Sequence, residues 1–267
     1  MCLIVIGIFV GFASGLLGVG GGFILVPTLF LIMNGNGIDS ALALKISLGT
    51  SLAIMVPTAI FSSYNHYRTS KFDIRLGLVL GCFGLIGGIF GALVAINTDF
   101  EILRIILGIV FIIVALNMFF KVEKQSHEKI NEDLKLDLRK LFYGGILGLG
   151  IGFLSGLFSL GGGIFIIPIL TIVLGFSMIE AIRTSTIFIS ITAIGGSIPY
   201  FLANIDNNNN IFLIGYVNIF YLLIIISFSI PITYFGAKLA YKINEKLLKR
   251  MLALLLVFFS LKLIGLI

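Results

Sequence analysis

The chain contains two copies of one glycine-rich, proline-ended segment. Residues 11–29, GFASGLLGVGGGFILVPTL, align without a gap on residues 152–170, GFLSGLFSLGGGIFIIPIL, and ten of the nineteen positions are identical. A match of this length at a constant offset of 141 residues indicates an internal duplication. Weaker matches follow in the same order: Gly49-Thr50-Ser51 with Arg183-Thr184-Ser185, and Phe90-Gly91-Ala92 with Phe235-Gly236-Ala237. The chain therefore divides into two homologous halves.

Long apolar runs place both halves in a lipid bilayer. Hydrophobic residues make up 59% of the 267 positions and charged residues 11%, against roughly a quarter charged in soluble domains, which excludes a water-soluble fold. About 20 apolar residues cross the hydrocarbon as a helix, and continuous runs disfavour strands. We expect an all-α, polytopic transmembrane bundle. Each half has four apolar blocks, near 3–33, 41–64, 74–96 and 101–120 in the first and near 141–174, 180–203, 213–240 and 246–267 in the second.

A charged linker, residues 121–140, separates a first transmembrane repeat, 1–120, from a second, 141–267. Its mixed charges indicate a solvated spacer, with a short amphipathic surface helix as the alternative. The apolar start of the chain has no basic residue before it, so we expect it to belong to the mature fold. Cys2 and Cys82 lie in apolar surroundings, so neither a disulfide framework nor a Cys-based metal site is predicted.

The first block of each half is too long for one crossing. Its 31 to 34 residues would span about 50 Å as a single helix, and each has a glycine cluster near its middle. We therefore predict that each block is a broken helix, with its hinge at 18–22 or 159–163, that is either re-entrant or crosses twice. In both forms the chain leaves on the side from which it entered. Pro27 and Pro168 are expected to kink or position the second arms.

The basic residues select this topology. If the two long blocks double back, fifteen of the 18 Lys and Arg lie on one side and three, Lys45, Arg104 and Lys262, on the other. The positive-inside rule then places the linker in the cytoplasm and both termini outside. Each half makes an odd number of net crossings, so we expect inverted repeats, which recur among secondary transporters. The net charge of +6 therefore reflects topology, and no nucleic-acid partner is predicted.

The glycine hinges are the strongest candidate for a substrate site. Glycine lets backbone approach a ligand closely, and a helix that restarts after a break presents unpaired N–H groups with partial positive charge. Two such ends meeting from opposite halves could hold a small oxyanion. The alternative, tight helix packing, is what we expect for the rows Gly7, Gly11, Gly15 and Gly144, Gly148, Gly152, Gly156. The candidate binding residues are Gly20, Gly21, Gly22, Gly161, Gly162 and Gly163.

Hydroxyl and basic side chains supplement the hinges. Hydroxyls inside apolar helices can donate to an oxyanion, although many bond the carbonyls of their own helix. The candidates are Ser14, Thr50 and Ser51 with their repeat mates Ser155, Thr184 and Ser185. Lys45 and Arg183, near helix starts, either attract the substrate or snorkel to the interface. His66, at a helix end, is a candidate for gating or proton coupling, with an interfacial structural role as the alternative.

No carboxylate stands in the middle of an apolar block, because the acidic residues lie in the linker or at block ends. Selective cation transport is therefore disfavoured, although unwound backbone can coordinate Na⁺. No cluster of His, Asp or Cys inside the spans could activate water or a nucleophile. We expect no enzyme activity, no metal and no cofactor.

The doubled segment, with GTSLAIMVPTAIFSSYNHYR followed by Phe72-Asp73-Ile74, resembles the sulfite exporter TauE/SafE family over nearly the whole chain. The resemblance implies a prokaryotic plasma-membrane permease for sulfite, sulfoacetate or another small sulfur-containing anion, driven by an ion gradient of H⁺ or Na⁺. Alternating access is the expected mechanism; an anion channel on the same scaffold and a transporter of another small anion are the alternatives. Arg183 stands where the family more often has a small residue. Oligomeric state does not follow from the sequence.

Overall fold

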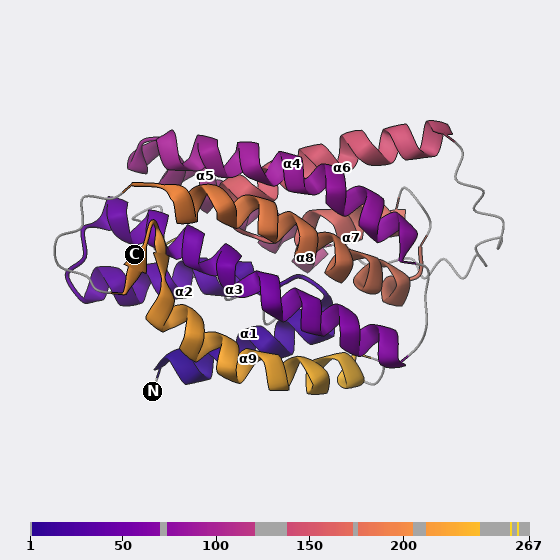
Figure 1. Cartoon of the computed structure of the whole chain (residues 1–267), viewed down its shortest axis with the longest axis horizontal. Coiled ribbons are helices and arrows are strands. Elements are labelled where there is room, and N and C mark those ends of the chain that lie inside the picture. Colours follow the sequence, from indigo (N-terminus) through magenta and orange to yellow (C-terminus); the bar gives the residue numbers. More distant parts are fainter. Residues whose placement is uncertain are drawn as a thin grey trace.

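The computed structural model describes residues 2–69, 74–120, 138–172, 176–204 and 212–240, together with Val257 and Leu261. The helices run approximately along the long axis of the molecule (Figure 1). They are α1 (Cys2–Leu17), α2 (Gly22–Gly35), α3 (Ser40–Thr69), α4 (Arg75–Asn97), α5 (Phe100–Phe120), α6 (Leu138–Phe158), α7 (Gly163–Ile172), α8 (Met178–Leu202) and α9 (Ile219–Leu239). Most of the predicted linker and nearly all of the last apolar block, 246–267, lie outside the described residues.

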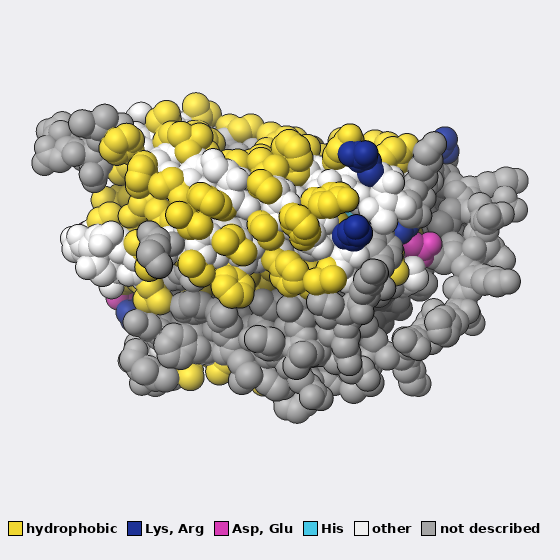
Figure 2. Space-filling view, turned by 90° about the horizontal axis from the view of Figure 1, so that it is seen from below, with side chains coloured by type: hydrophobic (Ala, Val, Ile, Leu, Met, Phe, Trp, Pro, Cys, Tyr) yellow, Lys and Arg dark blue, Asp and Glu magenta, His cyan; other side chains and the backbone are white. Residues whose placement is uncertain are grey.

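The described helices fit a membrane. Four of them, α3, α4, α8 from Ile179 onwards, and α9, are long and apolar enough to cross a bilayer. Figure 2 shows apolar side chains over most of the coloured part of one face, with the visible Lys and Arg side chains mainly towards one end. Large apolar side chains such as Phe9 and Leu223 are more than half exposed. Exposed apolar side chains of this size are stable where lipid surrounds the protein. The prediction of a helical membrane bundle is confirmed at this level.

Both long blocks are broken at their glycine clusters. α1 ends at Leu17 and α2 begins at Gly22, while α6 ends at Phe158 and α7 begins at Gly163. In Figure 1, α2 turns back towards the end of the molecule at which α1 begins, and α7 turns back in the same way beside α6 at the opposite end. The predicted helix breaks are therefore confirmed.

The hinges need backbone angles that glycine adopts most easily. Gly20 and Gly21 have φ of 81° and 77°, and their repeat mates Gly161 and Gly162 have φ of 73° and 71°. Ser159 takes the same left-handed conformation at φ 54°, which costs a non-glycine residue about 1–2 kcal/mol. The two hinges thus share one local conformation, as expected for copies of one segment.

The glycine rows are packing surfaces, as predicted. α1 lies along α9, where a β-carbon on Gly11 would collide with the carbonyl oxygen of Ser229. α6 lies along α4, where a β-carbon on Gly152 would collide with the carbonyl oxygen of Gly84. Each half therefore places its first helix against the helix of the other half's third apolar block, and small residues allow the backbones to approach closely.

A short hairpin departs from the all-α prediction. Strands β1 (Leu213–Ile214) and β2 (Val217–Asn218) pair antiparallel before α9, so the block expected to be helical from 213 becomes helical only at Ile219. Gly215, at φ 55°, allows the tight turn, and the Asn218 side chain caps α9 by accepting a hydrogen bond from the amide of Tyr221 at 3.1 Å. Turn and cap together keep this stretch out of the helix.

Candidate substrate site

The two glycine hinges lie against each other in the core of the bundle. A β-carbon on Gly22 would collide with the carbonyl oxygen of Ser159. One on Gly163, the repeat mate of Gly22, would lie 2.6 Å from the α-carbon of Val19 and 2.7 Å from the carbonyl oxygen of Gly18. All six candidate hinge glycines are buried. The structure therefore brings the two predicted halves of the site into direct backbone contact.

Serines of the Thr-Ser pairs bind the opposite hinge. The hydroxyl of Ser185 on α8 donates to the carbonyl oxygen of Gly18 at 2.7 Å, and it lies equally close to the carbonyl oxygen of Ile182 in its own helix. The hydroxyl of Ser51 on α3 donates to the carbonyl oxygen of Ser159 at 3.4 Å. Because Gly18 and Ser159 are repeat mates, the two bonds are equivalent, and each half holds the hinge of the other.

The hinges also present donors. The carbonyl oxygen of Gly21 accepts from the first-turn amides of α2, and that of Gly162 accepts from those of α7. The amides of Gly20, Gly21, Gly161 and Gly162 have no acceptor among the described residues. Successive amides form a concavity that binds anions where a left-handed residue adjoins a right-handed one. Gly21 and Gly162 are left-handed and directly precede the helices α2 and α7, whose N-termini carry partial positive charge that favours an anion.

Several buried hydroxyls near the hinges have no hydrogen-bond partner among the described residues. Ser14 and its repeat mate Ser155 are fully buried in this state, and a β-carbon on Gly162 would lie 3.5 Å from that of Ser155. The hydroxyls of Ser159 and Tyr200 are likewise buried; they lie near each other, and neither has another partner among the described residues. A buried, unsatisfied polar group destabilises a fold by about 1–3 kcal/mol, so these hydroxyls are groups that a ligand could satisfy.

Tyr200 was not among the residues that the sequence analysis selected. Extending the match of residues 49–51 with 183–185 without a gap pairs Thr58-Ala59-Ile60 with Thr192-Ala193-Ile194, and then His66 with Tyr200. His66 was already a candidate, so its alignment with Tyr200 was the sequence signal that could have identified Tyr200.

Two predicted polar residues have structural contacts in this state. The hydroxyl oxygen of Thr50 accepts a hydrogen bond from the amide of Asn218 at 2.9 Å, which ties α3 to the hairpin. Lys45 donates from Nζ to the carbonyl oxygen of Ile96 at 2.7 Å, at the end of α4, and lies 6.0 Å from the centre of the Tyr216 ring. Thr184, the mate of Thr50, is buried.

The His66 and Tyr200 ends of the site differ in chemistry. His66 bonds from Nε2 to the carbonyl oxygen of Gly15 at 2.8 Å, so this nitrogen carries the proton. Arg183, only 8% exposed, lies close enough for its charge to act on His66. At the equivalent place in the other half, Gly49 packs against Tyr200, where a β-carbon would lie 2.9 Å from that of the tyrosine. The His66 end of the site therefore has the positive charge of Arg183, whereas the Tyr200 end has a phenol group.

Membrane-length helices around two broken helices that cross at buried hinges define a polytopic membrane protein of the transporter type. The chain matches the family described as Sulfite exporter TauE/SafE over residues 3–263, and it therefore belongs to this family of membrane transporters.

Its relatives carry transporter descriptions. The chain is 34% identical over 255 residues to a "Probable membrane transporter protein" of Methanocaldococcus jannaschii, covering 95% of this chain and 90% of that protein. It is 26% identical over 256 residues to the "Probable membrane transporter protein YunE" of Bacillus subtilis, covering 92% and 88%. A protein of Haemophilus influenzae with the same description is 28% identical over 258 residues, covering 96% and 94%. No solved structure matches the chain.

Proposed function

We propose that this protein is a secondary transporter of a small sulfur-containing anion, such as sulfite or an organosulfonate, and that it works by alternating access. The observation that carries the proposal is the direct contact of the two hinges, where four amides and a set of hydroxyls have no partner in the described part of the chain. Backbone amides and hydroxyls can bind an oxyanion without an ionised partner. The anion binds between the hinges through these donors.

The reciprocal packing of the halves supports the alternating-access part. The broken helices approach from opposite ends of the molecule (Figure 1), which is the arrangement expected of inverted repeats. The serine bonds to the opposite hinge, Ser185 to Gly18 and Ser51 to Ser159, would strengthen and weaken alternately as one half rocks against the other. In the proposed orientation the linker is cytoplasmic and both termini are extracytoplasmic, in the plasma membrane.

An ion gradient drives the cycle. Among the described residues, His66 is the buried imidazole near the hinges, and histidine is a common carrier of protons, which makes H⁺ one coupling ion to test. The unwound hinge carbonyls offer ligands for Na⁺, the other. Arg183, beside His66, attracts the anion towards this end of the site.

A flux screen in proteoliposomes tests the proposal. Purified protein would be assayed with sulfite, thiosulfate, sulfate, sulfoacetate and taurine, under imposed H⁺ and Na⁺ gradients. We expect slow, saturable flux of at least one sulfur-containing anion, with counterflow from loaded vesicles. Single-channel currents without counterflow would instead indicate a channel. Folded protein that moves none of these anions would contradict the proposal.

A further inference from the structure

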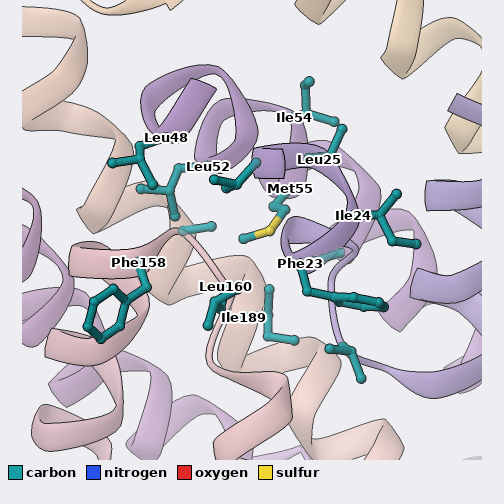
Figure 3. Close-up of a cluster of buried hydrophobic side chains, with 14 of the residues drawn as sticks. Phe23, Ile24, Leu25, Leu48, Leu52, Ile54, Met55, Phe158, Leu160 and Ile189 are labelled. Carbon is teal, nitrogen blue, oxygen red and sulfur yellow. The ribbon is translucent and has the colours of Figure 1, made fainter. Parts of the chain in front are cut away.

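The space between the two hinges is filled by two apolar side chains that are repeat mates. Met55 on α3 and Ile189 on α8 occupy equivalent positions in the extended alignment. A β-carbon on Gly22 would lie 2.6 Å from the Met55 sulfur, and one on Gly163 would lie 2.8 Å from Cδ1 of Ile189. Figure 3 shows both side chains in one buried cluster with Leu160. Each half thus inserts one apolar side chain between the hinges.

Both side chains contact both hinges. The Met55 methyl group would lie 2.8 Å from a β-carbon on Gly161, and Cγ2 of Ile189 would lie 3.0 Å from one on Gly20. The Met55 side chain is completely buried, and so is that of Ile189. The two side chains occupy the volume beside these glycines, which leaves no room there for an anion. Binding therefore requires at least one of them to move.

The two side chains differ in how easily they move. Methionine is unbranched, with three rotatable side-chain bonds and a polarizable sulfur, so it changes rotamer and fills irregular spaces at small cost. Isoleucine is branched at its β-carbon, and in a helix it is restricted to one χ1 rotamer. Met55 is thus the side chain that can leave, and Ile189 the one that stays as a wall.

We propose that the Met55 side chain occupies the place of the substrate between the hinges and swings out when the anion binds, while Ile189 forms a fixed apolar wall that determines which anions fit. This inference rests on the proposed anion transport and adds to it a rule of selectivity.

The rule follows from the shape of the anions. Sulfite and organosulfonates present three oxygens on one side and a lone pair or a carbon on the other, so their oxygens can meet the hinge amides while the remaining side meets Ile189 and Met55. Sulfate presents oxygen on every side, so one oxygen would face the apolar wall without a donor. Burying an oxygen in this way is unfavourable, and a site rejects a molecule whose polar groups are left unpaired.

A matched pair of variants tests whether Ile189 determines which anions fit. Val and Thr have nearly the same shape and differ in one hydroxyl, so Ile189→Val and Ile189→Thr both trim the wall, but only threonine offers sulfate a donor. The preference, kcat/KM for methanesulfonate over that for sulfate, should stay near the wild-type value in Ile189→Val and fall about tenfold or more in Ile189→Thr. An equal preference in the two variants would overturn the assignment of the wall.

Cysteine accessibility tests the movement of Met55. With Cys2 and Cys82 replaced by Ala, Met55→Cys would be treated during turnover with the anionic thiol reagent 2-sulfonatoethyl methanethiosulfonate. We expect labelling that slows several-fold in saturating methanesulfonate. Ala92→Cys, fully buried in the contact between α4 and α6, is the matched control and should stay unlabelled. An unreactive Met55→Cys, or labelling that methanesulfonate leaves unchanged, would overturn the inference.

The proposed transport and the proposed role of Met55 and Ile189 can fail separately. If wild-type protein moves no anion in the flux screen, the proposed substrate class is wrong and the selectivity rule falls with it. Labelling of Met55→Cys by the aqueous reagent would then still place Met55 in an opening between the hinges. If wild-type protein moves methanesulfonate but both variant tests fail, the proposed function stands and the role of Met55 and Ile189 does not.

Discussion

The hydroxyl of Ser185 donates a 2.7 Å hydrogen bond to the carbonyl oxygen of Gly18, a residue 167 positions away in the other half of the chain. The repeat-equivalent bond, from Ser51 to Ser159, is longer, at 3.4 Å. Since hydrogen bonds weaken with distance, the hinge of α1 and α2 is held more tightly than the hinge of α6 and α7. In this state the two halves are therefore related but unequal.

This inequality predicts unequal effects of two serine variants. Ser185→Ala should lower the free energy of unfolding by about 1 kcal/mol, because a short buried hydrogen bond is lost, whereas Ser51→Ala should lower it by a smaller amount. Thermal unfolding of the two variants in detergent checks this. Each of the two variants is the control for the other, because both serines are completely buried. A larger loss in Ser51→Ala would contradict the assignment.

Valine at the hinges should stop transport. Gly21 and Gly162 have positive φ, and β-carbons there would come within 2.7 Å of Val10 and of Phe188. A left-handed conformation costs an L-residue about 1–2 kcal/mol, so the double variant Gly21→Val, Gly162→Val should distort both hinges and lose flux while still inserting into the membrane. Flux in proteoliposomes and membrane yield are the measurements.

Gly150→Ala is the matched control for the hinge variants. Gly150 lies on α6 with nothing within 4 Å of its β-carbon position, and alanine is the better helix former by about 1 kcal/mol. We expect wild-type flux and equal or higher thermal stability. Normal flux in the double valine variant would contradict the assignment of the hinges as the substrate site.

Tyr200→Phe separates a binding role from a packing role. The ring is completely buried, and among the described residues its hydroxyl lies near that of Ser159 alone, so phenylalanine keeps the volume and removes only this buried polar group. Thermal stability should be unchanged or slightly higher, while KM for the transported anion should rise about tenfold if the hydroxyl binds it. An unchanged KM would show that the hydroxyl does not touch the substrate.

His66 can be tested with one conservative and one disruptive variant. Glutamine can still donate to the carbonyl oxygen of Gly15, the partner of His66 Nε2 at 2.8 Å, but it cannot take up a proton; alanine can do neither. His66→Ala should therefore lower the unfolding temperature more than His66→Gln. If His66 couples transport to H⁺, His66→Gln should keep substrate binding and lose the response of flux to a pH gradient. A retained response would point to Na⁺.

The sequence was informative about features that depend on repetition and composition. Glycine triplets in the middle of blocks longer than one crossing predicted both breaks, because only a hinge fits about 50 Å of helix into a 30 Å layer. Glycines at every fourth position predicted the close contacts of α1 and α6, since that spacing puts them on one helix face.

The features that the sequence did not predict depend on contacts between distant residues. The hairpin before α9 is fixed by the bond of the Asn218 amide to Thr50, a residue in the other half. The placement of Met55 and Ile189 between the hinges follows only from how α3 and α8 pack, because an apolar residue in an apolar helix carries no mark of its role. Tyr200 was overlooked since a buried tyrosine looks like core until its hydroxyl is seen to lack a partner.

Anomalous diffraction from crystals soaked in selenite, a heavier analogue of sulfite, would test the central claim most directly. If the anion binds between the hinges, we expect a selenium peak between the amides of Gly21 and Gly162, beside Ile189. The Met55 side chain should then have moved away from its position between the hinges. A selenium peak elsewhere in the molecule, with Met55 still packed against Gly22 and Gly161, would contradict it.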